Sequence, residues 1–387
     1  MMELGWAAIL LRIALRLWPV WLALALSFGA ARAFRHRLGF LGRLLDSRTG
    51  MTGLALVLFW TFAALLAPLI VTHDPLAQLS GMRNAVPGTP LPDPQGGGYP
   101  HYLLGGDALA RDVFSRMIAG ARAVLAIAPA AALVAYMTGI SLGLPAGYYR
   151  GRIDAGLTFA ANLVIAFPGI LLFFLLVTPE IRQTPIPRAM SAILFAIPLA
   201  FAAQLIRTRH VANRTRRRAL LALTLALGVW AWSGLVLDAD PLGLWRMPPN
   251  LLNIFIAVVF VSAPVVFRIT RGLTLDLASR DYVAAARTRG ETPAYIMLWE
   301  ILPNARGPLI VDFCLRIGYI TILLGALGFF GLGVSPESPD WGSTINQGRR
   351  LLTAYPHAAL APALALMSLV LGLNLLADGL REESLRD

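Results

Sequence analysis

The residue types required for nucleotide, metal or nucleophilic chemistry are nearly absent from this chain. Every one of its 33 basic residues is arginine, whereas a phosphate-binding GxxxxGK[ST] loop needs a lysine that reaches the terminal phosphates. The five histidines and the single cysteine, Cys314, form neither a CxxC nor an HExxH spacing. We therefore expect no catalytic residues, no metal and no cofactor bound by this chain.

A charged stretch that begins at residue 281, "DYVAAARTRG", is the main candidate for an interaction site. Asp281 is expected to cap the start of a helix, because its carboxylate accepts free backbone N–H groups. Residues 282–289 are strong helix formers, and we expect Ala284, Ala285 and Ala286 along one side. Such a small face favours docking into a groove on another protein, with an ordinary partnerless loop as the alternative.

The next residues predict a turn and a second helix. Gly290 suits the left-handed conformation that ends a helix. Thr292 is expected to cap the second helix, with Pro293 at its first position. Pro303 is expected to end that helix before the next apolar run.

Long apolar runs on both sides of this stretch define the fold class. Hydrophobic residues make up 57% of the 387 residues and charged residues only 14%, against roughly 25% charged in soluble proteins. A membrane-spanning helix needs about 20 consecutive apolar residues. The sequence predicts an all-α polytopic membrane protein of about eight spans, at residues 51–72, 123–149, 155–179, 189–206, 219–237, 247–267, 317–336 and 351–377.

Arginines gather in every second connection between these runs, most densely in "RTRHVANRTRRR" at 207–218. Short cytoplasmic loops collect basic residues, so this loop, residues 32–48 and the stretch after residue 281 are predicted to face the cytoplasm. The net charge of +12 is then a consequence of topology, and no nucleic-acid partner is expected. For residues 4–31 three alternatives remain: an interfacial amphipathic helix, a ninth span, or a cleaved signal peptide.

Residues 73–118 form the longest connection on the opposite side, here called the external connection. The prolines and glycines of "VPGTPLPDPQGGGYP" argue against regular structure in it. Its histidines, His73 and His101, have no obvious partners in the sequence.

Several blocks resemble the inner-membrane permeases of ABC importers. "AAARTRG", followed by Leu302 and Pro303, resembles the EAA signature of that family. Other blocks resemble its C-type dipeptide and oligopeptide branch, also called the peptide/nickel/opine class, and follow in family order: "LLGGDALARDVFSRMIAGAR" (103–122), "YYRGRIDAGL", "AFPG" (166–169), "LGFFGLGVSPESPDWG" (327–342) and "NLLADGLRE" (374–382).

This resemblance implies a type I importer permease fold with six core spans and two sets of functional residues. The set implied to couple the chain to an ATPase is Asp281, Tyr282, Ala284, Ala285, Ala286, Arg287, Gly290, Leu302 and Pro303. The set implied to form the external family motif is Gly105, Asp107, Arg111, Asp112, Ser115, Arg116, Gly120 and Arg122.

The resemblance also implies partners. They are a homologous B-type permease, two cytoplasmic ATPase subunits that bind ATP and Mg²⁺, a periplasmic solute-binding protein and membrane lipid. The chain would not be an enzyme itself, and would form half of an inner-membrane pathway for peptides or a similar small solute. Nickel, glutathione, opines and oligosaccharides stay open as substrates, and an autonomous ion-coupled secondary transporter or a polytopic membrane enzyme are the alternative functions.

The chain departs from the family pattern in two places. Ala284 occupies the glutamate position of the signature, so any polar contact of that glutamate is absent. Residues between the third and fourth core spans are expected to form an inserted helical hairpin. The expected organisation is 1–50 for an extra helix and basic segment, 51–179 for three core spans, 180–249 for the insert, and 250–387 for the last three core spans, with the coupling loop at 273–306.

Overall fold

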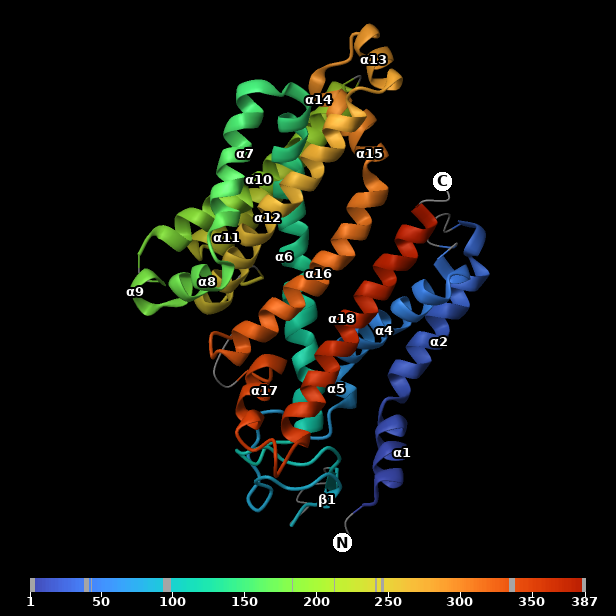
Figure 1. Cartoon of the computed structure of the whole chain (residues 1–387), viewed down its shortest axis with the longest axis vertical. Helices are drawn as coiled ribbons and strands as arrows, with labels where there is room; N and C mark the ends of the chain where they lie inside the picture. The colour runs from blue at the N-terminus through green and yellow to red at the C-terminus, as the bar shows by residue number, and fades with distance from the viewer. Residues whose placement is uncertain are drawn as a thin grey trace. The chain divides into compact units, whose positions relative to one another are not determined.

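The computed structural model describes residues 4–37, 42, 44–92, 99–182, 184–211, 213–240, 242–244, 247–333 and 338–384. Seven of its helices are long and apolar enough to cross a membrane, and two bent helix pairs pass the same test together. The predicted all-α polytopic fold is confirmed, and each of the eight apolar runs contains a helix or a bent pair (Figure 1). The chain divides into two compact units, residues 1–129 with 314–387, and residues 130–313.

The first unit contains both ends of the chain and the external connection. Its elements are α1 (Trp6–Arg16), α2 (Trp18–Ala33), η1 (Arg35–Arg37), η2 (Leu44–Asp46), α4 (Arg48–Leu65), α5 (Ala67–Ile70), β1 (Thr89–Pro90), β2 (His101–Tyr102), α17 (Trp341–Arg349) and α18 (His357–Ser384). The start of α6 (Val113–Tyr149) and the end of α16 (Arg306–Phe329) complete it.

Glycines bring α4 and α18 into close contact. A Cβ atom on Gly53 would lie 2.2 Å from the backbone nitrogen of Leu376, and one on Gly379 would lie 2.4 Å from the Cα of Gly50. Small residues at helix interfaces let membrane helices approach closely, which compensates for the missing hydrophobic drive between them in lipid. Trp60 of α4 also donates a 2.8 Å hydrogen bond to Ser368 of α18.

The N-terminal pair α1 and α2 bends by 55° and is apolar enough to cross the membrane as one broken span. α1 contacts the external connection, because Arg12 lies 3.1 Å from His101 Nδ1 and Leu4 N donates to Gly88 O. Arg16 donates to the carbonyls of Ile70 and Val71, at the end of α5. Among the three alternatives for residues 4–31, these contacts favour a broken ninth span over an interfacial helix.

The external connection contains a small antiparallel sheet, in which Thr89 pairs with Tyr102 and Pro90 with His101. The prediction that proline and glycine exclude regular structure here was therefore wrong for these four residues. Proline is compatible with a sheet of two edge strands, because its missing N–H can face away from the ladder. Residues 93–98 of this connection, and residues 334–337 of the motif at 327–342, lie outside the described residues.

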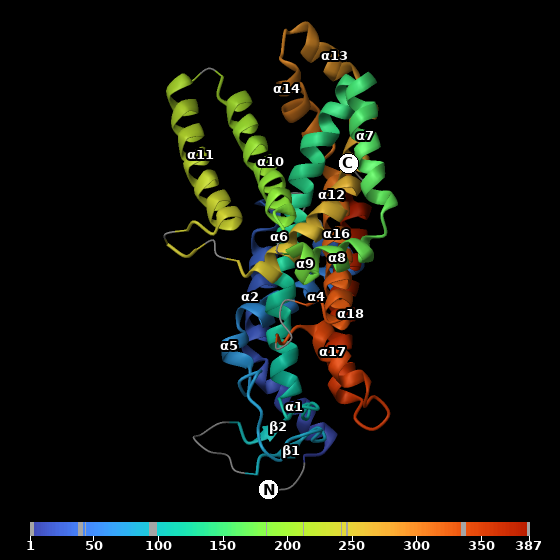
Figure 2. The same cartoon turned by 90° about the vertical axis from the view of Figure 1, so that its left-hand side faces the viewer.

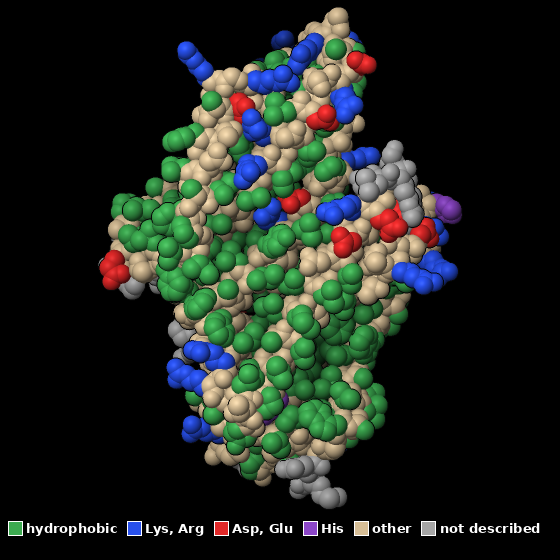
Figure 3. Space-filling view, in the orientation of Figure 1, with side chains coloured by type: hydrophobic (Ala, Val, Ile, Leu, Met, Phe, Trp, Pro, Cys, Tyr) green, Lys and Arg blue, Asp and Glu red, His purple; other side chains and the backbone are tan. Residues whose placement is uncertain are grey.

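The second unit carries the coupling loop and the hairpin. It contains the end of α6, then α7 (Gly151–Ala166), α8 (Gly169–Val177), α9 (Pro179–Arg182), α10 (Ile186–Arg209), α11 (Arg214–Leu237), α12 (Pro249–Leu277), α13 (Asp281–Thr288), α14 (Pro293–Tyr295), a π-helix (Ile296–Ile301), α15 (Leu302–Asn304) and the start of α16. On the face seen in Figure 3, arginine and acidic side chains gather over the end that carries α13.

The third predicted span is not one straight helix. α7 and α8 meet at an 81° bend between Ala166 and Gly169. Pro168 stands at this break in an extended conformation, and proline disfavours helical geometry in the residue before it. The "AFPG" block therefore marks a break within the apolar run.

A row of glycines on α6 packs against α12. Cβ atoms on Gly139, Gly143 and Gly147 would lie 2.6, 2.7 and 2.6 Å from the Cβ atoms of Val266, Thr270 and Thr274. The four-residue spacing on both helices places these contacts along one seam. At the end of that seam Arg271 of α12 pairs with Asp154 of α7, with Nη2 2.7 Å from Oδ2.

Residues 186–237 form a helical hairpin of α10 and α11, within the range expected for the insert. Figure 2 shows α10 between α11 and the helices α6 and α14. Trp232 of α11 donates a 2.9 Å hydrogen bond to the carbonyl of Ala192 on α10, and Leu199 fills the space beside Gly228. That this hairpin is an addition to the family fold stays a prediction.

Candidate functional site

The coupling loop begins with α13, Asp281–Thr288. Arg280, rather than Asp281, occupies the N-cap position, and it makes no side-chain capping bond. The predicted cap was therefore displaced by one residue. Asp281 lies in the first turn, where its negative charge still favours the positive end of the helix dipole.

The three alanines of α13 do not share one side, so this prediction was wrong. Val283 and Ala286 are fully buried in a core with Ile296 and Ile301, whereas Ala284 and Ala285 are exposed. Successive helical residues differ by about 100° in direction, so consecutive alanines must spread around the helix. The result is an α13 anchored by Val283 and Ala286, with a small outer face of Ala284 and Ala285.

Tyr282 and Arg287 lie at the edge of this anchor. Tyr282 packs against the buried core of α13, and burial raises the pKa of its phenol. The Arg287 guanidinium lies over the ring of Tyr148, 5.0 Å from its centroid, so a cation–π contact ties α13 to the end of α6.

The predicted turn after α13 is confirmed. Gly290 has φ +78°, a conformation that other residues adopt only under strain. Thr292 Oγ1 accepts a hydrogen bond from Tyr295 N, and Pro293 stands in the first turn of α14. These residues reverse the chain towards the membrane-spanning part of α16.

Pro303 does not end the second helix as expected. The helical run continues from α14 through the π-helix and α15 to Asn304. In an α-helix the Pro303 ring would clash with the carbonyl of Trp299, and the wider π turn lies directly before it. Leu302 packs against the same core as α13.

Three contacts that were not predicted from the sequence hold the π-helix. Arg289 Nη2 lies 2.8 Å from Glu300 Oε1, which joins the end of α13 to the π-helix. Trp299 Nε1 donates a 2.8 Å hydrogen bond to Thr208 Oγ1 of α10, and Arg209 lies over the Trp299 ring, 4.6 Å from its centroid. The two Trp299 contacts join segments about ninety residues apart, so no local spacing pattern predicts them.

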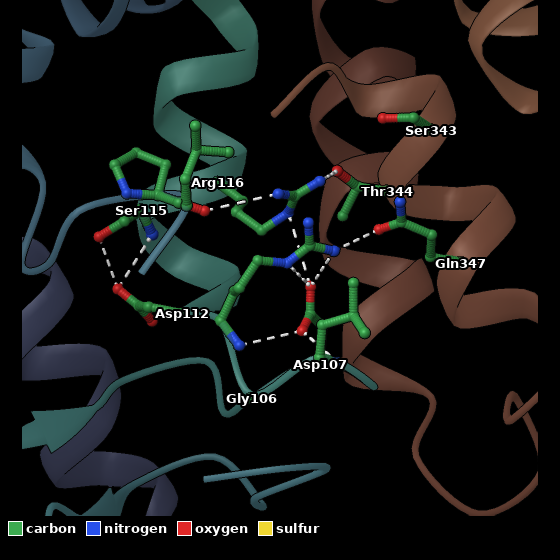
Figure 4. A network of polar contacts seen from close by, with 12 residues as sticks. Gly106, Asp107, Asp112, Ser115, Arg116, Ser343, Thr344 and Gln347 are labelled. Carbon is green, nitrogen blue, oxygen red and sulfur yellow. Dashed lines mark hydrogen bonds and ion pairs between the residues drawn. The ribbon is translucent and has the colours of Figure 1, made fainter. Parts of the chain in front are cut away.

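The external motif forms a buried charge network in the first unit (Figure 4). Arg111 Nε donates to Asp107 Oδ2 at 2.8 Å, and Arg116 Nε lies 3.7 Å from the same oxygen. All three side chains are at most 4% exposed. Arg111 also donates to Gln347, and Arg116 donates to Thr344 Oγ1 at 3.0 Å. The network therefore fastens the start of α6 to α17.

A second cluster of the motif starts α6. Asp112 precedes the helix and accepts from Ser115 N and from Thr72 Oγ1. Ser115 Oγ accepts from the backbone N–H groups of Thr72 and His73, each at 3.0 Å. His73 Nδ1 lies 3.4 Å from Asp112 Oδ2. The histidines of this connection thus have partners, contrary to expectation.

The two glycines of the motif allow close approach, and one arginine stands apart. Gly105 has φ +80°, and a Cβ there would lie 2.4 Å from Ala85 O. A Cβ on Gly120 would lie 2.6 Å from the ring of Trp341. Arg122 is exposed on α6 and belongs to neither cluster. Five of the eight expected residues therefore lie in the two polar clusters, and the two glycines allow close packing beside them.

Burial changes the acid–base behaviour of two groups near the network. The pKa of Tyr102 is raised, chiefly by burial and further by the charge of Asp112. Asp340 caps α17 through Ser343 N at 2.8 Å, and burial raises the pKa of its carboxyl. Within the described residues no group of three His, Cys, Asp or Glu side chains could hold a metal ion.

The long apolar helices define a polytopic all-α membrane protein, which carries an exposed helical turn on a buried core and a buried charge network in its external connection. The sequence pattern described as "binding-protein-dependent transport system inner membrane component" matches residues 241–382. The pattern "N-terminal TM domain of oligopeptide transport permease C" matches residues 38–87.

Individual relatives agree with these matches. The chain is 31% identical to the glutathione transport system permease protein GsiD of Pectobacterium atrosepticum, over 73% of this chain and 71% of the relative. It is 29% identical to the di/tripeptide transport system permease protein DppC of Pseudomonas aeruginosa, over 91% and 89%. It is 28% identical to the dipeptide transport system permease protein DppC of Haemophilus influenzae, over 87% and 90%.

The chain belongs to the family of inner-membrane permease subunits of binding-protein-dependent ABC importers, in its dipeptide and oligopeptide branch. It is a multi-pass protein of the inner membrane. The resemblance drawn from the motifs is thereby confirmed, whereas the roles of single residues stay predictions.

Proposed function

We propose that this chain forms half of the translocation pathway of an importer for small peptides, and that α13 receives the force of an ATPase subunit. Its partners would be a second permease, two ATPase subunits that bind ATP and Mg²⁺, and a periplasmic solute-binding protein. The peptide substrate is proposed because similar proteins are named as glutathione, dipeptide and di/tripeptide permeases.

The observation that carries this proposal is the construction of α13. Its inner residues, Val283 and Ala286, are fully buried, and its outer residues, Ala284 and Ala285, are small and exposed. Small exposed side chains would let another protein pack closely against the outer face of such a helix. The buried inner face would pass a movement of the helix to the core beneath it. Because the chain has no lysine for a phosphate-binding loop, the nucleotide site would belong to the partner.

Force on α13 would reach two spans. α13 follows α12 after only three residues, and the π-helix and α15 connect it to α16. The Arg289–Glu300 ion pair and the shared core of Val283, Ile296 and Ile301 make α13 and the π-helix move together. Closure of the ATPase subunits would thus turn α12 and α16 and open the pathway.

Co-purification tests the proposal. Ala285→Trp is expected to weaken association with the ATPase about 5- to 150-fold, because a misfitted large side chain costs about 1–3 kcal/mol. Ala219→Trp is the matched control, since Ala219 is an exposed alanine at the arginine-rich end of the hairpin, and it should leave association unchanged.

The alternative function, an autonomous transporter, predicts uptake without an ATPase subunit. An ion-coupled secondary transporter would take up solute when the purified chain alone is reconstituted with an ion gradient. Uptake of that kind, or full ATPase association in the Ala285→Trp variant, would overturn the proposed coupling role.

A further inference from the structure

An open pocket of about 450 Å³ lies in the second unit between α6, α10 and the coupling loop. Its lining is mainly apolar, and includes Leu144, Tyr149, Ala200, Phe201, Met297 and Leu298. A pocket with such apolar walls suits a flexible hydrocarbon chain.

Arginines follow the pocket-lining residues along α10. Arg207 follows Ala200 by seven residues, two helical turns, and therefore lies on the same face of α10. Arg207 is exposed and begins the 207–218 segment, which contains six arginines. Between residues 181 and 237 the sequence has no acidic residue, so nothing in the hairpin neutralises this charge.

One acidic side chain of the coupling loop, two residues after the pocket-lining Leu298, is already engaged. Glu300, beside Trp299, pairs with Arg289 at 2.8 Å. Arg209 is held over the Trp299 ring, which leaves Arg207 and the arginines from Arg214 onward available to a ligand from outside the chain. An apolar pocket beneath an unneutralised cluster of arginines matches the two parts of an anionic phospholipid.

We propose that this pocket binds an anionic phospholipid, with an acyl chain between α6 and α10 and the phosphate at Arg207 and the arginines of the hairpin loop. A bound lipid would touch Met297 and Leu298 of the π-helix, which shares its core with α13. The site is therefore placed to stabilise the coupling loop. An effect of the lipid on transport would rest on the coupling role proposed above, whereas binding of the lipid does not depend on that role.

Lipid retention by the purified complex tests this site. The complex is washed in detergent, incubated with phosphatidylglycerol or with phosphatidylcholine of the same chain length, and its bound lipid is measured by mass spectrometry. We expect preferential retention of phosphatidylglycerol. Arg207→Gln should weaken it about fivefold, the change given by about 1 kcal/mol for one basic residue at an anionic surface.

Matched variants separate the pocket from general lipid contact. Ala200→Trp fills the pocket mouth and should abolish the preference, whereas Ala222→Trp on the exposed face of α11 should not change it. Arg188→Gln, an exposed arginine at the opposite end of α10, should likewise have no effect.

Three results would overturn the proposal. They are equal retention of the two lipids, unchanged retention in Ala200→Trp, and a photo-crosslinker at position 200 that labels the second permease instead of lipid. Association with the ATPase is measured on the same samples. Loss of bound phosphatidylglycerol in Arg207→Gln or Ala200→Trp, with ATPase association intact, supports the lipid site. Failure of the wild-type chain to associate with the ATPase would instead defeat the proposed coupling function.

Discussion

The charged residues of the external motif other than Arg122 are buried, so their stability contribution depends on pairing with one another. Asp107 is surrounded by Arg111 and Arg116 and accepts two backbone hydrogen bonds, from Leu109 and Arg111. Its carboxylate compensates two guanidinium groups that burial removes from water, and such groups are costly when left unpaired. The motif therefore acts as a structural joint between α6 and α17.

Asp107→Asn should destabilise the chain by about 3–5 kcal/mol, because it leaves both arginines without their buried counter-charge. Thermal unfolding of the purified complex in detergent measures the effect. Asp74→Asn is the control, since Asp74 is exposed and only caps a turn at Leu76 N, a role that asparagine also fills. Equal stability of the two variants would show that the network does not fasten the fold.

The sequence predicted which residues belong to this motif, but it did not predict which residues they contact. The motif at 103–122 singled out Asp107, Arg111 and Arg116 by resemblance. Their contacts with Thr344 and Gln347 join segments more than two hundred residues apart, and no local spacing encodes them. His73 was missed for the same reason.

At the scale of elements, close helix packing depends on glycine. The row of Gly139, Gly143 and Gly147 lets side chains of α12 pack directly against the backbone of α6. The sequence carried a readable signal for this seam, since glycines at intervals of four are typical of membrane helix contacts.

Gly143→Ala should cost about 1–3 kcal/mol, because the new Cβ would lie 2.7 Å from Thr270 Cβ and 2.9 Å from Phe267 O. Gly156→Ala on α7 meets nothing within 4 Å. In Gly156→Ala, the better helix propensity of alanine should raise the free energy of unfolding by up to about 1 kcal/mol. Opposite signs in thermal unfolding are the expected result, and a neutral Gly143→Ala would refute the close seam.

The turn between α13 and α14 was predicted correctly, whereas the cap at Asp281, the alanine face and the helix end at Pro303 were not. Gly290, Thr292 and Pro293 behave as their local chemistry requires, because caps and turns depend on neighbouring residues only. The predicted alanine face was wrong because consecutive helical residues point in different directions. The helix end predicted at Pro303 was wrong because the π-helix precedes the proline and the helical run continues to Asn304.

For the whole molecule, the eight apolar runs predicted the order of the candidate membrane segments after residue 50, and the bent pair α1–α2 adds one more candidate before them. Hydropathy works here because a backbone in lipid must satisfy its own hydrogen bonds, which leaves the helix as the available form. Hydropathy did not reveal the 81° bend between α7 and α8 or the 55° bend between α1 and α2, although Pro168 stands at the first break and Arg16 directly before the second. The pocket beside α10 depends on packing and was equally beyond the sequence.

Sidedness is the claim on which the coupling account depends most. In a Cys314→Ser background, which removes the chain's single cysteine, Ala285→Cys places a thiol on the exposed face of α13. A membrane-impermeant maleimide should label it in inside-out vesicles and leave it unmodified in intact cells with a permeabilised outer membrane. Labelling of position 285 in those intact cells would place α13 outside the cytoplasm and contradict the account.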